Sequence, residues 1–437
     1  MTNVIMANRL YLLLLLGASL SMAIGYWGPD LPPGPYCGRG SPQCCQDRQD
    51  SCSHEILSTL CYCDQFCNRS RVHDDCCPDY EEVCLGISPP PNVLEGCKYK
   101  NKLHIPGDKV LQGCNECECV VDSNNPNQAI WSCEQELCLI SDDVISNVNY
   151  GSESWRASNY SEFSGKKLKD GIKYKLGTFP LTAETKRMGA IRYDKNIAYP
   201  RDFDSRSYWP GYISPVIDQG WCGSDWAVTI ATVVSDRFAI QSNGIEKLVL
   251  SPQTLLSCNR RYQRGCDGGH IDVAWNYVRE DGLLDDNCFP YVAKVTNCPV
   301  KPKSDYLPTM CTPDIPERTT RYKVGPPGKL KKEEDIMYDI MESGPVHAIM
   351  TVYQDFFHYR DGVYRHTRFG DNTLQGLHSV RIIGWGENRG EKYWVVANSW
   401  GEQWGINGYF HIARGENESG IESFVVTVLS DVINAKK

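Results

Sequence analysis

The stretch DQGWCGSDWAV, residues 218–228, places an aspartate, Asp225, at the start of an apolar run that is predicted to be a helix. A nucleophilic thiol is well placed at such a helix start, because the helix dipole favours the anion and lowers the thiol pKa. A carboxylate is a poor nucleophile toward an amide, and its acyl product would be a mixed anhydride. Asp225 is instead expected to cap the helix and to meet the positive end of its dipole, a contribution of ~0.3–1 kcal/mol.

Two later stretches carry an imidazole and a carboxamide. His378 lies in LHSVRIIGWG, and Asn398 and Trp400 lie in ANSWGEQWGINGYF. Covalent hydrolysis needs a nucleophile, an imidazole that activates it, a group that orients the imidazole, and donors for the oxyanion. Both stretches adjoin β-branched and aromatic runs bounded by glycine and asparagine, which predict strands. A helical first half followed by a strand-rich second half favours an α+β fold.

Five separated motifs in this part of the chain resemble those of the papain family, most closely its cathepsin B branch. They are DQGWCGSDWA, SPQTLLSC, GCDGGH, LHSVRIIGWG and ANSWGEQWGINGYF. The resemblance covers roughly residues 145–430. It implies a papain-like domain at 201–437 with two lobes, a helical left lobe and a β-rich right lobe.

The resemblance implies a role for each matching residue. Gln219 would be the side-chain oxyanion donor, His378 the base, Asn398 the residue that orients the base, and Trp400 the ring that shields this pair. The remaining implied residues are Gly268 and Gly269, which would offer backbone to a bound peptide, Phe424, which would make the second specificity pocket apolar, and the disulfide Cys222–Cys266. Two further bridges of open partnership are left for Cys258, Cys288, Cys298 and Cys311.

At the nucleophile position the family has cysteine and this chain has Asp225. In triads generally, loss of the nucleophile alone costs on the order of a millionfold in turnover. Rescue by Ser224 is not expected, because one residue along a helix turns the side chain by about 100°. The segment after Cys288 lacks the paired histidines of the cathepsin B occluding loop, so dipeptide removal is not implied. No metal or cofactor is expected, since the other histidines show no ligand spacing: His270, His347, His358, His366 and His411.

The rest of the composition indicates a secreted chain. The 22 cysteines fall into three even groups, at 37–84, 97–138 and 222–311, so each group is expected to close its own disulfides in an oxidising compartment. The apolar run after Arg9 is shorter than the roughly 20 residues of a membrane span and predicts a signal peptide at 1–25. Sequons predict glycosylation at Asn68, Asn159 and Asn417. A formal net charge of −9 argues against nucleic-acid binding, and no transmembrane anchor is expected.

Two cysteine-rich stretches ahead of the papain-like part resemble small extracellular modules. Residues 33–86, with CYCDQFC followed by DDCCPDYEEVC, resemble the somatomedin B domain, a disulfide-stabilised protein-binding module. A stiff proline-rich linker is expected at 87–96. Residues 97–139, with CNECEC, look like the first half of a von Willebrand factor type C module. The spacing of Cys114 and Cys117 would also suit zinc, but a secreted chain favours disulfides.

Residues 140–200 lack cysteine and are polar and tyrosine-rich, which alone indicates a linker with short helices. Beside the papain-like motifs, they are similar to the propeptide of cathepsin B-type enzymes, which lies along the active-site cleft. The basic run GKKLKDGIKYK at 165–175 is expected to be a solvated surface, with contact to acidic glycans as the less favoured alternative.

The order of these parts resembles the tubulointerstitial nephritis antigen family, whose members are secreted matrix glycoproteins with a replaced nucleophile, commonly serine. The aspartate at 225 departs from that detail. The resemblance implies a non-catalytic adaptor of the extracellular matrix and basement membrane that binds laminin- or collagen-type proteins and, in some members, secreted signalling ligands. Two alternatives stay open: a peptidase with unorthodox chemistry at Asp225 and His378, and a cleft that traps peptides.

Overall fold

The computed structural model describes residues 35–56, 59–68, 75–87, 96–152, 154–193, 197–300, 321–367 and 374–430. The predicted signal peptide at 1–25 lies outside these ranges, as does all of the predicted linker at 87–96 except its two end residues. No helix within the ranges has the length and apolarity needed to cross a membrane.

Disulfides hold the first cysteine-rich stretch together. Its elements are η1 (Cys37–Arg39), β1 (Ser53–Ile56), β2 (Thr59–Tyr62), η2 (Gln65–Asn68) and α1 (Tyr80–Cys84). Its five bridges are Cys37–Cys63, Cys44–Cys84, Cys45–Cys52, Cys61–Cys77 and Cys67–Cys76. Most of its buried residues are cysteines, joined by Tyr36, Ile56 and Tyr80. A stretch with so few aliphatic side chains needs covalent links in place of a large apolar core.

The second cysteine-rich stretch is built from short antiparallel strands. Its elements are β3 (Cys97–Tyr99), β4 (Lys102–His104), β5 (Lys109–Gln112), β6 (Asn115–Asp122) and β7 (Asn125–Cys133), of which β5, β6 and β7 form one sheet. Disulfides join Cys114 to Cys138 and Cys117 to Cys133, so the zinc alternative for Cys114 and Cys117 is wrong. Each bridge described so far stays within its own group of cysteines, as the even counts predict.

A nine-stranded sheet forms the β-rich lobe of the C-terminal part. Its strand order is β10-β16-β11-β13-β14-β15-β12-β8, and β9 pairs with β13 off that path. The bounds are β8 (Trp155–Ala157), β9 (Phe203–Asp204), β10 (Gly328–Leu330), β11 (Val346–Tyr353), β12 (Tyr359–Tyr364), β13 (Leu374–Asn388), β14 (Glu391–Ala397), β15 (Tyr409–Ala413) and β16 (Val425–Thr427). The predicted strands around His378 and before Asn398 are β13 and β14, and the α+β prediction is confirmed.

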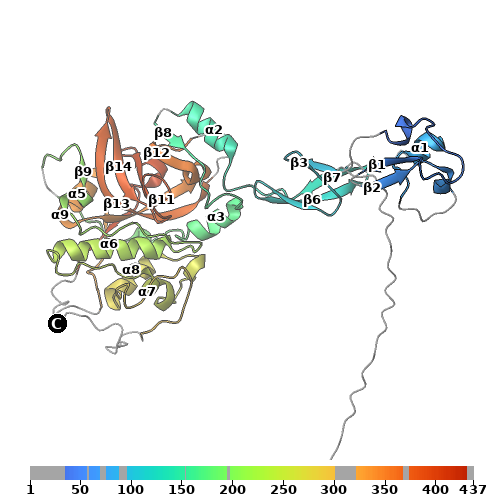
Figure 1. Ribbon diagram of the computed structural model, residues 1–437. Coiled ribbons are helices and arrows are strands. Elements are labelled where there is room, and N and C mark those ends of the chain that lie inside the picture. Colours follow the sequence, from blue (N-terminus) through green and yellow to red (C-terminus); the bar gives the residue numbers. More distant parts are fainter. Residues whose placement is uncertain are drawn as a thin grey trace, which may run out of the picture. The chain divides into compact units, whose positions relative to one another are not determined.

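Helices form the other lobe and border the sheet. They are α5 (Ser205–Tyr208), α6 (Asp225–Gln241), α7 (Pro252–Cys258), α8 (Ile271–Glu280) and α9 (Glu333–Ser343), with 3-10 turns η3 (Gly265–Asp267), η5 (Gln354–His358) and η6 (Glu418–Gly420). Helix α6 lies between the strands and the pair α7 and α8 (Figure 1). Residues 225–240 of α6 are all buried, which explains why apolar side chains lie on every face of this helix and not along one stripe.

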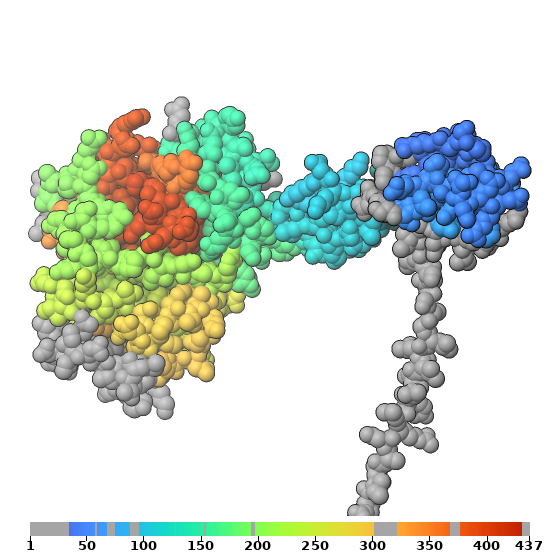
Figure 2. All heavy atoms as spheres, in the orientation of Figure 1, coloured from blue at the N-terminus to red at the C-terminus, as the bar shows by residue number. Residues whose placement is uncertain are grey.

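Residues 140–200, hereafter the prosegment, contain more structure than the predicted linker. They form α2 (Asp142–Gly151), β8, α3 (Leu168–Lys175) and α4 (Ala183–Lys186). Strand β8 pairs antiparallel with β12 and so extends the main sheet. Trp155, Phe163 and Leu168 are buried in the same core cluster as the strands of the β-rich lobe. The blue-green prosegment lies against the orange and red strands in Figure 2.

Candidate functional site

The carboxylate of Asp225 is at the centre of the predicted site and is fully buried. One oxygen, Oδ1, accepts a hydrogen bond from the backbone N–H of Gly177 at 2.6 Å. The other, Oδ2, accepts from the Thr178 hydroxyl at 2.7 Å and from the Ser379 N–H at 2.8 Å. Gly177 and Thr178 belong to the prosegment, 48 and 47 residues earlier in the chain. The aspartate therefore binds a distant segment of its own chain.

The expectation that Asp225 caps its helix is wrong. Asp225 is the first residue within α6, the N-cap is Ser224, and no side chain caps this end. The carboxylate is instead bonded by donors from the prosegment and from strand β13. Bonds from such donors satisfy both of its oxygens, so the amides of α6 are not needed as partners.

His378 contacts Asp225 from strand β13. Its Nδ1 lies 3.1 Å from Asp225 Oδ2, and its Nε2 lies 2.8 Å from Asn398 Oδ1. Asn398 Oδ1 also accepts the Ser399 N–H, which identifies this atom as an acceptor and makes His378 Nε2 the donor. A proton must then lie between Nδ1 and Oδ2, because two lone pairs would otherwise face each other. An imidazolium beside a carboxylate satisfies every partner.

Trp400 covers this pair, as the resemblance implies. Its ring centroid lies 5.1 Å from that of His378, and the ring is fully buried. Its indole N–H points at the carbonyl of Lys175 in the prosegment, at 3.4 Å. The ring that would shield the base therefore also contacts the prosegment.

A chain of hydrogen bonds leads from the helical lobe to Asp225. The Trp275 indole N–H donates to His347 Nδ1 at 3.2 Å, so His347 carries its proton on Nε2 and donates it to the Ser379 hydroxyl at 2.9 Å. The Ser379 hydroxyl lies 2.7 Å from the Thr178 hydroxyl. Thr178 donates its own hydroxyl proton to Asp225. Burial lowers the pKa of His347 to about 3, although the charge of Asp225 acts in the opposite direction, and the ring stays neutral.

Gln219, the predicted oxyanion donor, is fully buried, and its side-chain amide already donates hydrogen bonds to two backbone carbonyls. Its Nε2 donates to the carbonyl of Cys222 at 2.8 Å and to that of Tyr174, in the prosegment, at 3.1 Å. Its Oε1 accepts from the Ser399 hydroxyl at 2.6 Å. The Gln219 amide that is predicted to donate to an oxyanion thus donates to the carbonyl of Tyr174 in the prosegment.

Backbone pairing continues on the other side of Asp225. Gly269 donates its N–H to Gly177 O at 2.9 Å and accepts the Phe179 N–H at 3.0 Å. Thr178 also forms an isolated bridge with Leu377. Gly269 does offer its backbone to a peptide, which is residues 177–179 of the same chain, whereas the backbone of Gly268 bonds Gly265 and Arg264 within its own loop.

Two glycines permit this close approach. A Cβ on Gly177 would lie 1.9 Å from the carbonyl oxygen of Gly223 and 2.6 Å from Asp225 Oδ1. A Cβ on Gly268, which has a φ of +119°, would lie 2.4 Å from the Phe179 ring. No larger residue fits at either position without displacement of its neighbours.

Lys175 departs from the expected solvated surface of the basic run at 165–175, whereas Lys166, Lys169 and Lys173 of that run are exposed. Its side chain is fully buried, 2.6 Å from a carboxylate oxygen of Glu162 and 3.9 Å from one of Asp218. Its ammonium lies 5.2 Å from the centroid of the Trp221 ring, a cation–π contact. Lys175 directly precedes the residues that contact Asp225, and it holds this end of the prosegment in place.

The other residues singled out from the sequence lie in separate places. Phe424 is buried in the helical lobe's core cluster, where Leu181 and Met188 of the prosegment pack. Cys222 and Cys266 form a disulfide, as do Cys258 and Cys298, while Cys288 is bonded and Cys311 lies outside the described residues. Ser224 is buried with its hydroxyl 2.5 Å from that of Tyr291.

The three sequons differ in accessibility. Asn159 and Asn417 are exposed, although the Asn417 side chain is hydrogen-bonded to Ser423. The side chain of Asn68 lies outside the described part of the structure. Glycosylation at these positions stays a prediction.

Sequence reasoning missed Gly177, Thr178 and Ser379 as partners of Asp225, and His347 as the partner of the Ser379 hydroxyl. In KLGTF, Gly177 has no side chain and Thr178 has a hydroxyl, so this dipeptide could approach and bond a carboxylate. Nothing in the neighbouring sequence predicts which carboxylate that is. The hydrogen bonds hold the Asp225–His378 pair together and hold Gly177 and Thr178 of the prosegment beside it. Both carboxylate oxygens of Asp225 already accept hydrogen bonds from other parts of the chain.

Three comparisons show which known proteins this chain is similar to. Residues 199–429 match the family described as "Papain family cysteine protease". The "Tubulointerstitial nephritis antigen-like" protein of Mus musculus is 37% identical and covers 96% of both chains, and the "Tubulointerstitial nephritis antigen" of Homo sapiens is 37% identical over 90% of this chain and 86% of its own. Among solved structures, a procathepsin B from Trypanosoma congolense has a TM-score of 0.59 and 29% identity, and covers 67% of this chain and 99% of its own.

Proposed function

Because the chain belongs to the papain family of cysteine proteases and, within it, to the tubulointerstitial nephritis antigens, we propose that it is a secreted, non-catalytic binding protein of the extracellular matrix. The papain-like domain would serve as a rigid body whose cleft is closed by the chain's own prosegment. The cysteine-rich stretches would carry the contacts to matrix proteins of the laminin or collagen type, or to secreted signalling ligands.

One observation carries the non-catalytic part of this proposal. The residue in the nucleophile position is a buried carboxylate whose oxygens accept hydrogen bonds from Gly177, Thr178 and Ser379 and contact His378. A nucleophile must present a lone pair at about 3–3.5 Å from the reacting carbon with its orbital aligned. Asp225 supports attachment of the prosegment instead of attack on a substrate.

Extracellular location is supported by the disulfides. Nine bridges are described in full, and such density is typical of proteins that fold in oxidising compartments. In the first cysteine-rich stretch Leu60 and Phe66 are exposed, at 49% and 36% of their surface. Exposed apolar side chains on a small disulfide-bonded module suit contact with another protein.

The two alternatives gain less support. A peptidase acting through Asp225 and His378 would need the carboxylate to exchange its bonds to the prosegment for bonds to a substrate. A trap for foreign peptides would need residues 177–179 to leave Gly269. Both require release of the prosegment, which contributes a strand and several core residues to the domain.

The decisive experiment measures hydrolysis of a fluorogenic dipeptidyl substrate. Four full-length secreted proteins are compared: the wild type, Asp225→Cys, Asp225→Cys combined with Gly177→Val, and His378→Ala in the wild-type background. We expect no turnover by the wild type, weak turnover by Asp225→Cys, and stronger turnover when Gly177→Val also displaces the prosegment. Turnover by the wild type that His378→Ala abolishes would overturn the proposal.

Matrix binding needs its own test. Full-length protein is applied to surfaces coated with laminin or with collagen, and its binding is compared with that of a Leu60→Ser, Phe66→Ser double variant. We expect saturable binding to at least one surface and weaker binding of the double variant. Equal binding to albumin-coated surfaces would remove the support for specific matrix contact.

A further inference from the structure

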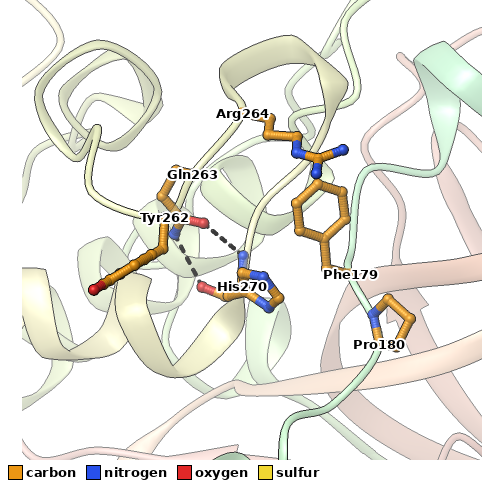
Figure 3. Close-up of a pocket in the computed structure, with 6 residues that line it drawn as sticks. All are labelled: Phe179, Pro180, Tyr262, Gln263, Arg264 and His270. Carbon is orange, nitrogen blue, oxygen red and sulfur yellow. Dashed lines mark hydrogen bonds between the residues drawn. The ribbon is translucent and has the colours of Figure 1, made fainter.

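The cavity drawn in Figure 3 belongs to the cleft, because Phe179 and Pro180 of the prosegment form part of its wall. Another cavity, of about 420 Å³, lies elsewhere in the helical lobe. Its walls come from the end of α7 and the residues that follow, from the later half of α8, and from residues 297–300. Within the described part of the chain, neither the prosegment nor Asp225 lines this cavity.

One wall of the cavity is tied to α7 independently of any ligand. A disulfide joins Cys258, the last residue of α7, to Cys298 in the segment 296–298. The Ser257 hydroxyl accepts the backbone N–H of Thr296 at 3.0 Å. A site whose walls are fixed in advance loses little conformational entropy when a ligand binds.

Arg260 is the charged residue among those described in the lining. Its Nε donates to the carbonyl of Ser257 and its Nη2 to the carbonyl of Thr296, each at 2.9 Å. A guanidinium has five N–H donors, so three of them, on Nη1 and Nη2, have no partner in the described part of the chain. Two backbone carbonyls therefore hold the guanidinium in one orientation and leave one of its edges available to a ligand.

Tyr277 and Asn297 add uncharged donors to the lining. Neither the Tyr277 hydroxyl nor the Asn297 carboxamide has a hydrogen-bond partner among the described residues. Burial raises the pKa of Tyr277 to about 12, an effect that the charge of Asp281 reinforces and that of Arg321 opposes. The hydroxyl therefore keeps its proton at neutral pH and can donate it to a ligand.

The remaining part of the lining is apolar. Val300 is buried, with 6% of its surface exposed, and forms a small core cluster with Leu284 and Cys288. The disulfide of Cys258 and Cys298 packs against this cluster and also lines the cavity. An apolar group bound here would be removed from water, which favours its binding.

The geometry points to this cavity as a binding site for an apolar carboxylate about the size of one amino-acid residue. The carboxylate would bond the open edge of the Arg260 guanidinium, whose fork matches its two oxygens. The apolar group would pack on the disulfide and on Val300, and Tyr277 and Asn297 would donate to the remaining lone pairs. A cation fits less well, because the described lining contains no carboxylate. Phosphate or sulfate fits less well because the described lining offers one cation and an apolar wall.

Two sources can supply such a group, a small free acid and the C-terminal residue of another protein. Both present a carboxylate beside an apolar side chain. Arg260 and Asn297 are exposed, so a chain that ends in the cavity could continue into solvent. The site goes beyond the proposed function, since it depends neither on retention of the prosegment nor on the residue at 225.

Fluorescence polarisation with the full-length protein tests the site. The probe is a fluorescein-labelled pentapeptide of four glycines and a terminal leucine with a free carboxylate. We expect saturable binding that weakens about tenfold when the carboxylate is amidated and about tenfold with Arg260→Gln. Arg260→Lys should fall in between, because it keeps the charge and loses the fork.

Arg261→Gln is the matched control, since the Arg261 guanidinium lies over the Tyr262 ring and is not part of the lining. It should bind the probe like the wild type. Tyr277→Phe removes a hydroxyl that has no partner among the described residues, so it should unfold in urea like the wild type and bind about threefold more weakly. Absence of saturable binding, equal binding of the amidated probe, or equal losses in Arg260→Gln and Arg261→Gln would overturn the inference.

Competition with unlabelled ligands identifies the source of the carboxylate. Displacement of the probe by N-acetyl-leucine as readily as by the unlabelled pentapeptide would assign the site to free acids. Displacement by the pentapeptide alone would assign it to chain ends. Substrate hydrolysis is measured on the same samples. Turnover by the wild type would defeat the proposed function alone, whereas probe binding that Arg260→Gln leaves unchanged would defeat only this site.

Discussion

The backbone nitrogen of Gly177 lies 2.6 Å from Oδ1 of Asp225 in the buried floor of the cleft. This bond joins two parts of one chain that are 48 residues apart. It also explains why an acidic residue is stable there, since a carboxylate can accept the several donors that converge on this point.

Replacement of Asp225 by alanine should destabilise the protein strongly. The change leaves the His378 ring and the donors of Gly177, Thr178 and Ser379 buried without their acceptor. Loss of one member of a buried ion pair costs about 3–5 kcal/mol, so we expect the urea midpoint to fall accordingly. Asp267→Ala removes an exposed carboxylate paired with Lys173 and should stay within about 0.5 kcal/mol of the wild type. Equal stability of the two variants would contradict the anchoring role of Asp225.

Gly177→Ala should loosen the prosegment from the cleft, because the new Cβ would lie 1.9 Å from the Gly223 carbonyl oxygen. Hydrogen exchange followed by mass spectrometry should show faster exchange in peptides covering 168–181, with α6 unchanged. Gly189→Ala is the control within the same segment. Its Cβ would have nothing within 4 Å, so exchange should be that of the wild type. Unchanged exchange in Gly177→Ala would show that the segment is held by other contacts.

Lys175→Glu should prevent stable docking of the prosegment. It places a carboxylate in a fully buried position beside Glu162 and near Asp218. Like charges at such distance in a buried site are strongly unfavourable, and we expect a loss of several kcal/mol or no secretion. Lys173→Glu reverses an exposed charge on the same helix and should cost less than about 1 kcal/mol. Secretion yield and urea unfolding of both variants provide the measurement.

The stability of the papain-like domain should fall as the pH decreases from about 6.5 toward 4. Burial lowers the pKa of His347 to about 3 and those of His358 and His411 to about 4, with smaller effects of neighbouring charges. The unfolded chain binds these protons near pH 6.5, so protonation favours unfolding below that value. The stabilisation is complete above pH 6.5 and is lost as the pH falls toward the folded pKa, at most ~1.4 kcal/mol per pH unit for each histidine.

Urea unfolding from pH 7.5 to 4.5 measures this dependence. His347→Gln can still accept from Trp275 and donate to Ser379, and it has no proton to gain. Its stability should therefore fall less steeply with decreasing pH than that of the wild type. Parallel profiles would show that His347 does not contribute to the acid sensitivity.

Several features could be predicted from the sequence because their signals are local or motif-based. The largely apolar run after Asp225 forms a buried helix, the runs around His378 and before Asn398 form strands, and the described disulfides pair cysteines of the same group. The aspartate at 225 is visible in one letter of DQGWCGSDWA. Such signals depend on residues near one another in the chain, or on a set of motifs specific to one family.

What Asp225 does was decided only by the tertiary structure. Its partners come from positions 177, 178, 378 and 379, and their distances depend on how the prosegment crosses the cleft. The same holds for Lys175, whose run looks like a solvated surface until Glu162 and Trp221 enclose it. Hydrogen bonds between distant residues leave no periodicity in the sequence. The motifs therefore indicate a papain-like domain with an aspartate at 225, and only the fold reveals that this aspartate bonds the prosegment.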